Sequence, residues 1–199
     1  ASCLVGSEMC IRDRKIILDQ LGGKLSENQV ICEPDRRNTA PCILMASLKI
    51  KKINSEAKIV VTPSDHLIVD QLLFREDLEL ALAASDKKNL ITFGIQPDFP
   101  ATGFGYISVK EDSNGSPLKS EMEFAEKPDE ATAQHFIDAK KYYCNSGIFV
   151  CSATAVLEGF KAHSLVLYDL FNKGFNHLNT DAEAAFVSQN YPLAEKHLY

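Results

Sequence analysis

Polar and charged residues gather in the stretch EPDRRNTAPC, which begins at Glu33. The carboxylate of Glu33 accepts hydrogen bonds, and the guanidinium of Arg37 binds anions and polar ligand edges. Asn38 and Thr39 then precede an apolar run, ILMASLKI, that has helical spacing. Because Thr39 can cap a helix and Pro41 fits its first turn, we expect a helix N-terminus here, whose exposed N–H groups favour anions.

A second candidate is Asp65, which follows the β-branched run KIVV in the stretch KIVVTPSDH. In open parallel sheets, ligands lie beyond the carboxyl ends of the strands. A carboxylate at that point can hold Mg²⁺ against phosphate oxygens. Taken alone, the stretch is more consistent with a turn or a cap formed by Asp65 and His66.

Two glycines surround an aromatic residue in TGFGYI, immediately before a predicted strand that begins near Tyr106. Glycine permits positive φ and lets a ligand approach the main chain closely, which makes Gly105 a candidate ligand contact. In isolation, a hairpin or a bulge that needs glycine for its geometry is the better explanation.

Charged and amide side chains end two further strands. In EKP, Glu126 can accept hydrogen bonds from sugar hydroxyls, and Lys127 can neutralise a phosphate. Adjacent side chains on a strand point to opposite faces unless a bend re-aims them, so a solvated strand end is the alternative. In CNSGIF, Asn145 offers both a donor and an acceptor, although alone it reads as a turn residue.

The pattern around these residues predicts the elements that position them. QVICEP, KIVV and NLITFGI read as buried strands that alternate with helices, the second helix carrying Phe74, Leu78, Ala81 and Leu82 on one face. That alternation indicates an α/β domain with a parallel sheet. Beyond it, GYISVK, EMEFAEKP and SGIFVC read as strands around a helix through EATAQHFIDAKK. We therefore expect a mixed, mainly parallel sheet, with helix again from SATAVLEGFKA.

Length and composition favour one domain, because 199 residues with 45% hydrophobic content can bury a single core. Residues 1–14 show neither helical nor strand periodicity, and we interpret them as a non-native segment outside the fold. Residues 15–199 form the predicted domain, beginning with a helix end in KIILDQL and a break at Gly22 and Gly23.

Charge and cysteine content exclude several classes of protein. A net charge of −6 argues against nucleic-acid and membrane-surface binding. Six scattered cysteines without a CxxC pair argue against a zinc site or a disulfide framework and favour reduced thiols. Since no apolar run reaches about 18 residues and no signal-peptide pattern occurs, we expect a soluble, cytoplasmic protein. The sequence leaves open whether the protein forms a homo-oligomer.

The order of the candidate stretches is more specific than any one of them. EPDRRNTAP, TPSDH, TFGIQPDFPATGFGYI, FAEKPD and CNSGIFV follow one another over about 120 residues. This series resembles the bacterial mannose-1-phosphate guanylyltransferases, including the nucleotidyltransferase half of those fused to a phosphomannose isomerase. The resemblance is close from Glu33 to Ser152 and looser on both sides.

The resemblance implies a Rossmann-like α/β/α nucleotidyltransferase domain that joins GTP and mannose 1-phosphate into GDP-mannose and releases pyrophosphate. It implies that Asp65 binds Mg²⁺ and that Asp65 and Lys127 are catalytic. It places the nucleotide on Glu33, Arg37, Asn38 and Thr39. It places the sugar phosphate on Gly105, Tyr106, Glu126, Lys127 and Asn145.

For Glu33 the resemblance suggests a specific hypothesis. The Watson–Crick edge of guanine presents two adjacent donors, which a carboxylate can accept together. Adenine presents a lone pair at N1 instead and would be rejected, since a buried polar mismatch costs on the order of a few kcal/mol.

This sequence also departs from the family pattern. A glycine-rich loop of the type GGxGTRLWPLSR and a later WSDIGSW-like acidic segment are missing, and Cys144 stands where tryptophan is usual. The resemblance therefore implies a domain incomplete at both ends, with weakened triphosphate binding and reduced or absent activity. Two alternatives stay open: a non-catalytic sugar-nucleotide-binding or regulatory module, and a nucleotidyltransferase for a different hexose 1-phosphate.

Overall fold

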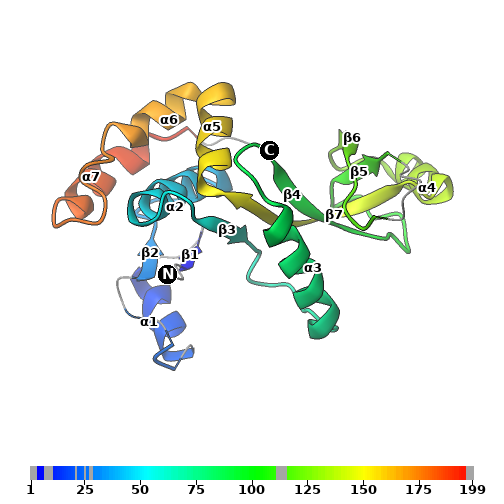
Figure 1. The fold of residues 1–199 in the computed structure, drawn as a ribbon, viewed down its shortest axis with the longest axis horizontal. Coiled ribbons are helices and arrows are strands. Elements are labelled where there is room, and N and C mark those ends of the chain that lie inside the picture. Colours follow the sequence, from blue (N-terminus) through cyan, green and yellow to red (C-terminus); the bar gives the residue numbers. More distant parts are fainter. Residues whose placement is uncertain are drawn as a thin grey trace. The chain divides into compact units, whose positions relative to one another are not determined.

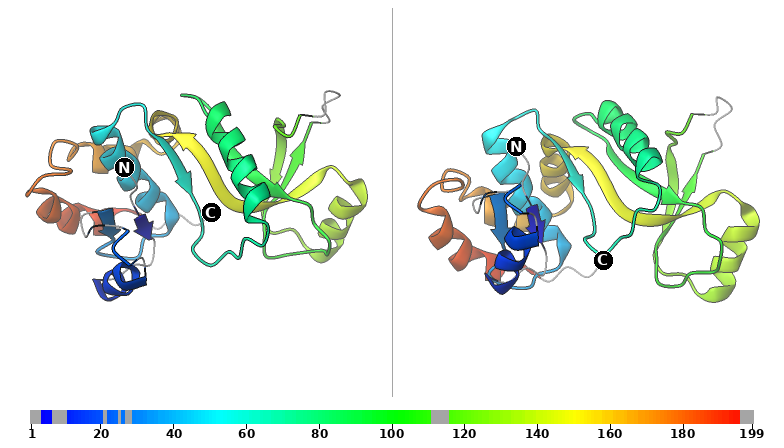
Figure 2. Two further views of the ribbon diagram at one scale, coloured as in Figure 1. Left: turned by 60° about the horizontal axis from the view of Figure 1, so that its bottom comes forward. Right: turned by 90° about the horizontal axis from the view of Figure 1, so that it is seen from below.

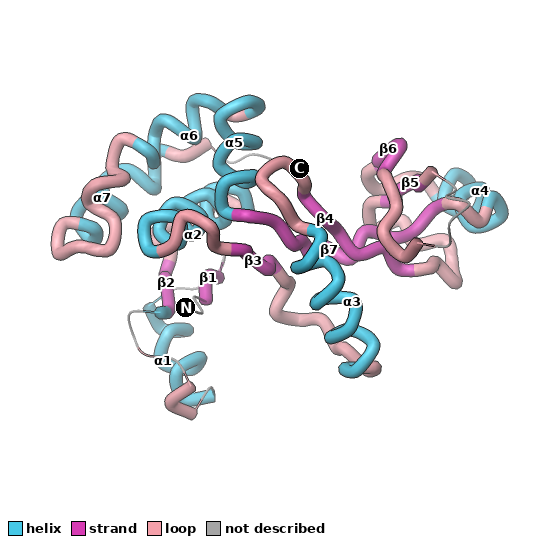
Figure 3. The backbone as a smooth tube through the Cα atoms, viewed as in Figure 1, coloured by secondary structure: helices cyan, strands magenta, loops and turns pink. Residues whose placement is uncertain are grey.

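The computed structural model describes residues 4–6, 11–20, 22–24, 26, 29–110 and 116–195. In this part of the chain, strands and helices alternate from β1 to β4, β5 and β6 then follow without a helix between them, and only helices follow the long strand β7 (Figures 1 and 3). The elements are β1 (Leu4–Gly6), α1 (Ile11–Gln20), β2 (Val30–Cys32), α2 (Thr39–Ile53), β3 (Lys58–Val61), α3 (Gln71–Ala84), β4 (Leu90–Ile95), β5 (Tyr106–Val109), β6 (Glu121–Ala125), α4 (Glu130–Ala139), β7 (Tyr142–Ser152), α5 (Ala153–His163), α6 (Leu165–Asn172), α7 (Glu183–Asn190) and the 3₁₀ helix η2 (Tyr191–Leu193).

The chain divides into two compact units. The first unit comprises residues 1–59, 86–89 and 151–199, and the second comprises residues 60–85 and 90–150. Strands β3 and β7 each run from one unit into the other. The single domain over residues 15–199 stays a prediction.

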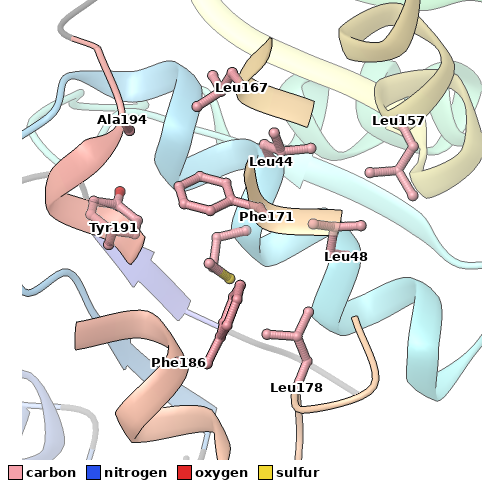
Figure 4. Packing of buried hydrophobic residues seen from close by; sticks show 10 residues of the cluster. Leu44, Leu48, Leu157, Leu167, Phe171, Leu178, Phe186, Tyr191 and Ala194 are labelled. Carbon is pink, nitrogen blue, oxygen red and sulfur yellow. The ribbon is translucent and has the colours of Figure 1, made fainter. Parts of the chain in front are cut away.

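Helix α2 is the centre of the first unit. Its stretch from Pro41 to Lys49 is buried at almost every position, and α5 and α6 pack against it (Figure 1). Leu44 and Leu48 meet aromatic side chains of the later helices, among them Phe171 and Tyr191, in one apolar cluster (Figure 4). Each fully buried leucine contributes roughly 1.5–3 kcal/mol of apolar burial, so this cluster is the main core of the unit.

Three lysines near the C-terminal end of α2 tie it to the rest of the first unit. Lys49 pairs with Glu183 of α7, and Lys51 donates to the hydroxyl of Thr154 in α5. Lys52 donates to the carbonyl oxygen of Asn176 at 2.9 Å. Cations near the C-terminus of a helix also interact favourably with its carbonyl dipoles.

The second unit is built on a sheet. Among the described residues the strand order is β3-β7-β5-β6, and β4 also pairs with β7. Strand β5 runs antiparallel to both β6 and β7. Helix α4 lies beside this end of the unit (Figure 2), and its Ala133 and Phe136 form a small core with Tyr106 and Tyr142.

The mixed α/β class is confirmed, but the predicted strand directions are partly wrong. The pairings of β5 in the large sheet are antiparallel, and a parallel pair is found in the separate sheet of β1 and β2. The strands predicted to be buried on both faces are also partly exposed: Leu90 is 62% exposed and Ile95 56%. An apolar run predicts that a strand forms, but whether its side chains are buried depends on which distant segments of the chain pack against it.

Residues 1–14 were left out of the predicted fold, yet β1 and the first turn of α1 fall within them. The non-native origin of residues 1–14 stays a prediction. Helix α1 ends at Gln20, and Gly22 and Gly23 take positive φ, as the predicted break requires. Among the described residues, no helix is long and apolar enough to cross a bilayer.

Candidate functional site

The first unit holds the residues predicted to bind the nucleotide. Glu33 directly follows β2, and its carboxylate accepts a hydrogen bond from the hydroxyl of Tyr191. The Tyr191 side chain is 1% exposed, and its ring stacks on Phe171 with 5.4 Å between centroids (Figure 4). The carboxylate of Glu33 is therefore anchored to the core of the unit.

The loop after Glu33 leads into α2. Arg37 pairs with Asp35 at 2.7 Å, and its side chain is 23% exposed. Asn38, with φ of 63°, occupies the N-cap position, and Thr39 is the first helical residue. The prediction that Thr39 caps the helix is therefore wrong by one residue, because the chain turns into the helix at Asn38, whose φ of 63° and ψ of −169° are not helical.

The second unit brings together several residues predicted to bind the sugar phosphate. The carbonyl oxygen of Gly105 accepts a hydrogen bond of 2.8 Å from the N–H of Asn145 on β7. A Cβ atom at Gly105 would lie 3.0 Å from Oε2 of Glu126 and 2.5 Å from Cζ of Phe124. Glycine at this position thus lets the carboxylate of Glu126 approach the main chain closely.

A bend at the end of β6 sets the geometry of Glu126 and Lys127. Lys127 has φ of 43°, and its Nζ lies 3.4 Å from Oε1 of Glu126. Because the chain bends at Lys127, the two neighbouring side chains meet as an ion pair instead of pointing to opposite faces. The Lys127 side chain is 58% exposed and that of Glu126 44%, so both can be reached by a ligand.

Asn145 is held by two donors. Its Oδ1 accepts hydrogen bonds from the hydroxyl of Thr92 at 2.9 Å and from the N–H of Gly147 at 3.2 Å. Gly147 takes φ of 72° within β7, and a Cβ there would lie 3.5 Å from Cγ of Pro63. Sequence reasoning missed Thr92, because a threonine inside TFGI reads as an ordinary strand residue.

Tyr106 was predicted to contact the sugar phosphate, but its side chain is fully buried. The hydroxyl accepts a hydrogen bond of 3.0 Å from the N–H of Ala101, and the ring packs on Phe136. Burial, followed by the neighbouring Cys144, raises the pKa of Tyr106, which keeps the hydroxyl neutral. The side chain is a core element, so a ligand contact at this position is limited to the main chain.

Asp65 lies in the exposed loop between β3 and α3. No cluster of three or more metal-ligating side chains occurs in the part of the chain that the structure describes. A lone exposed carboxylate still fits Mg²⁺, because this ion keeps several waters and usually takes only one or two carboxylates plus substrate phosphates.

Comparison with known proteins identifies the fold family. A family model for nucleotidyl transferases matches residues 11–190. The chain belongs to the nucleotidyl transferase family. Its residues 33–39 and the Gly105–Glu126–Asn145 cluster all lie inside the matched region.

Several curated relatives of this nucleotidyl transferase carry informative names. Mannose-1-phosphate guanylyltransferase of Escherichia coli K12 is 37% identical over 188 residues, covering 91% of this chain and 39% of that protein. Alginate biosynthesis protein AlgA of Pseudomonas aeruginosa is 38% identical over 158 residues, covering 78% of this chain and 33% of that protein. The chain thus spans between a third and two fifths of the length of these relatives.

Solved structures agree on the fold. A mannose-1-phosphate geranyltransferase from Thermus thermophilus superposes with a TM-score of 0.78 at 24% identity, covering 94% of this chain and 51% of that one. A mannose-6-phosphate isomerase from Helicobacter pylori gives a TM-score of 0.69 at 30% identity, covering 84% of this chain and 63% of that one.

Proposed function

We propose that this chain carries the site that transfers GMP from GTP to mannose 1-phosphate, giving GDP-mannose and pyrophosphate. The observation that carries the proposal is the convergence of Gly105, Glu126, Lys127 and Asn145 in the second unit. The names of the relatives, among them the guanylyltransferase of E. coli, support the choice of substrates.

In this proposal the second unit binds the sugar phosphate. The carboxylate of Glu126 accepts hydrogen bonds from sugar hydroxyls beside the main chain of Gly105. The ammonium group of Lys127 neutralises the sugar phosphate as a point charge. Since both groups are exposed and 3.4 Å apart, one ligand can contact both.

The first unit binds the nucleotide in this proposal. Glu33 accepts the donors of the guanine edge once the nucleotide opens access to its Oε2, which is buried in this structure. Arg37 with the N-terminus of α2 supplies positive charge and N–H donors. Tyr191 holds the Glu33 carboxylate in place. A pre-positioned acceptor loses less entropy on binding, which favours guanine recognition.

The reaction needs positioning and charge stabilisation more than covalent chemistry. A phosphate oxygen of mannose 1-phosphate attacks the α-phosphorus of GTP, a new P–O bond forms, and the bond to pyrophosphate breaks. Asp65 would hold a Mg²⁺ ion, which would neutralise phosphate charge when bound. Lys127 neutralises the charge of the attacking phosphate and holds that phosphate in place.

Cys144 and Cys151 carry thiols outside any disulfide, which supports a reducing, cytoplasmic setting.

The test is pyrophosphate release by this chain from GTP, mannose 1-phosphate and Mg²⁺. Turnover that falls in Lys127→Ala and persists in Lys161→Ala, an exposed lysine of α5, supports the proposal. Turnover with glucose 1-phosphate in place of mannose 1-phosphate would keep the reaction class but overturn the sugar. Binding of GDP-mannose without turnover in the wild-type chain would overturn catalysis and favour a binding module.

A further inference from the structure

Asn145 is held in one orientation by groups that contact only its amide oxygen. Oδ1 accepts from the Thr92 hydroxyl at 2.9 Å and from the Gly147 N–H at 3.2 Å. A backbone N–H can donate only to an acceptor, so the oxygen of the amide must face Gly147 and the nitrogen must face away. Two donors occupy the two lone pairs of Oδ1.

The end of Asn145 that remains for a ligand is therefore its NH₂ group, which donates. The main chain of Asn145 is bonded to Gly105, and a Cβ at Gly105 would lie 3.0 Å from Oε2 of Glu126, whose carboxylate only accepts. A sugar ring with neighbouring hydroxyls can satisfy both, because one hydroxyl donates to Glu126 while another oxygen accepts from Asn145.

We propose that Thr92 is a positioning residue that fixes Asn145 as a hydrogen-bond donor to the sugar 1-phosphate. Thr92 does not itself contact the ligand. It lies on β4, and its single hydroxyl hydrogen is shared between Oδ1 of Asn145 and the carbonyl oxygen of Ile148 at 3.1 Å, so β4 contacts β7 on both sides of Gly147. The inference rests on the proposed sugar-phosphate site and adds the residue that sets its donor–acceptor pattern.

The first experiment removes only the hydroxyl. Thr92→Val keeps a β-branched side chain in the strand, whereas Thr92→Ser keeps the donor. We expect Thr92→Val to raise the KM for mannose 1-phosphate about fivefold to tenfold, as the loss of one hydrogen bond to a polar group does. The KM for GTP stays unchanged, and Thr92→Ser stays close to wild type. Thr180→Val removes a hydroxyl that bonds to a backbone carbonyl in the first unit and serves as the matched control.

A double-mutant cycle with Asn145→Ala tests whether Thr92 acts through Asn145. If it does, adding Thr92→Val to Asn145→Ala raises the KM no further, because the group being positioned is already gone. Fully additive losses would overturn the inference, since Thr92 would then act on the ligand or the fold by another route.

A readout without substrate separates this inference from the proposed function. In the free protein, the side-chain amide signals of Asn145 in ¹H–¹⁵N spectra should move toward those of an unrestrained asparagine in Thr92→Val and stay in place in Thr92→Ser. If the Asn145 amide signals change in this way but the chain binds no sugar 1-phosphate, Thr92 does position Asn145, whereas the proposed substrate is wrong. If Thr92→Val leaves both the amide signals and the KM unchanged, the positioning role is overturned.

Discussion

The hydroxyl of Tyr191 donates a hydrogen bond to the carboxylate of Glu33, although 158 positions separate the two residues in the chain. Glu33 begins the loop that leads into α2, whereas Tyr191 is buried and stacks on Phe171 in the core of the first unit. A hydrogen bond from a buried aromatic side chain thus fixes the start of the loop that we propose to bind guanine. Recognition of the base then depends on the packing of the later helices.

Removing this hydroxyl is the most direct test of the relationship. Tyr191→Phe keeps the ring in the core and deletes the donor, so the Glu33 carboxylate loses its anchor. We expect the ratio of GTP to ATP affinity, measured by titration calorimetry, to fall severalfold, because hydrogen bonds to charged groups contribute about 1.5–3 kcal/mol. Tyr168→Phe, a change in a tyrosine that packs against the same core, is the control. An unchanged ratio in Tyr191→Phe would contradict the anchoring role.

Changing Glu33 itself tests the guanine hypothesis. Glu33→Gln replaces one carboxylate oxygen by an amide NH₂, so the side chain can no longer accept from both guanine donors. We expect GTP affinity to fall about tenfold or more, while inosine triphosphate, which lacks the 2-amino group, is affected less. Equal losses for GTP, inosine triphosphate and ATP would mean that Glu33 supports the fold and does not read the base.

Lys127 combines a charge with a left-handed backbone, and two substitutions separate these properties. Lys127→Ala and Lys127→Gly both remove the ammonium group, so we expect the same loss of mannose 1-phosphate affinity in both. Only glycine relieves the φ of 43°, which should make Lys127→Gly the more stable by up to about 1 kcal/mol in chemical denaturation.

Lys140 supplies the matched control for this pair. It has φ of 55° and ends α4 as its C-cap, and it is not among the residues assigned to the sugar phosphate. Lys140→Gly should give a similar gain in stability with unchanged mannose 1-phosphate affinity. A comparable loss of affinity in Lys140→Gly would show that the charge of Lys127 has no specific role.

Gly105 should be required for binding more than for stability. A methyl group there would meet Cζ of Phe124 at 2.5 Å and Oε2 of Glu126 at 3.0 Å. Phe124 is 47% exposed and can turn aside, so the melting temperature of Gly105→Ala should change little, whereas Glu126 is displaced from its position. We expect about a tenfold loss of mannose 1-phosphate affinity. Gly103→Ala, where nothing lies within 4 Å, should bind normally; a loss there would point to the loop backbone instead.

Local patterns in the sequence predicted most of the helices and strands. The apolar face that includes Phe74, Leu78 and Ala81 lies on α3, because helical periodicity is displayed directly in the sequence. The bend that brings Glu126 and Lys127 together was not predicted, because lysine rarely takes the positive φ found at Lys127.

Contacts between distant segments could not be predicted in the same way. Nothing near Tyr191 in the sequence indicates a partnership with Glu33, and Thr92 reads as a strand former whatever its hydroxyl does. Strand direction has the same difficulty, because the periodicity of β5 is identical for parallel and antiparallel neighbours. The exposure of Leu90 likewise depends on which segment covers the strand and not on the strand itself.

Cys151 gives a prediction about pH that does not depend on any substrate. Its side chain is 1% exposed on β7, and burial raises the pKa of the thiol from 9.0 to about 11. The native protein therefore keeps this proton in a pH range where the unfolded chain loses it. The contribution to stability is complete below pH 9 and is lost as the pH rises from 9 to about 11.

Comparing wild type with Cys151→Ala isolates this effect from the other groups that titrate in the same range. The difference in free energy of unfolding between the two proteins, measured by urea denaturation, should be constant from about pH 7 to 9. As the pH approaches 11, the free energy of unfolding of the wild type should then fall by about 2 kcal/mol relative to that of Cys151→Ala, since one pKa unit corresponds to roughly 1.4 kcal/mol. A difference that stays flat over the whole range would mean that the thiolate is tolerated where the structure buries the thiol.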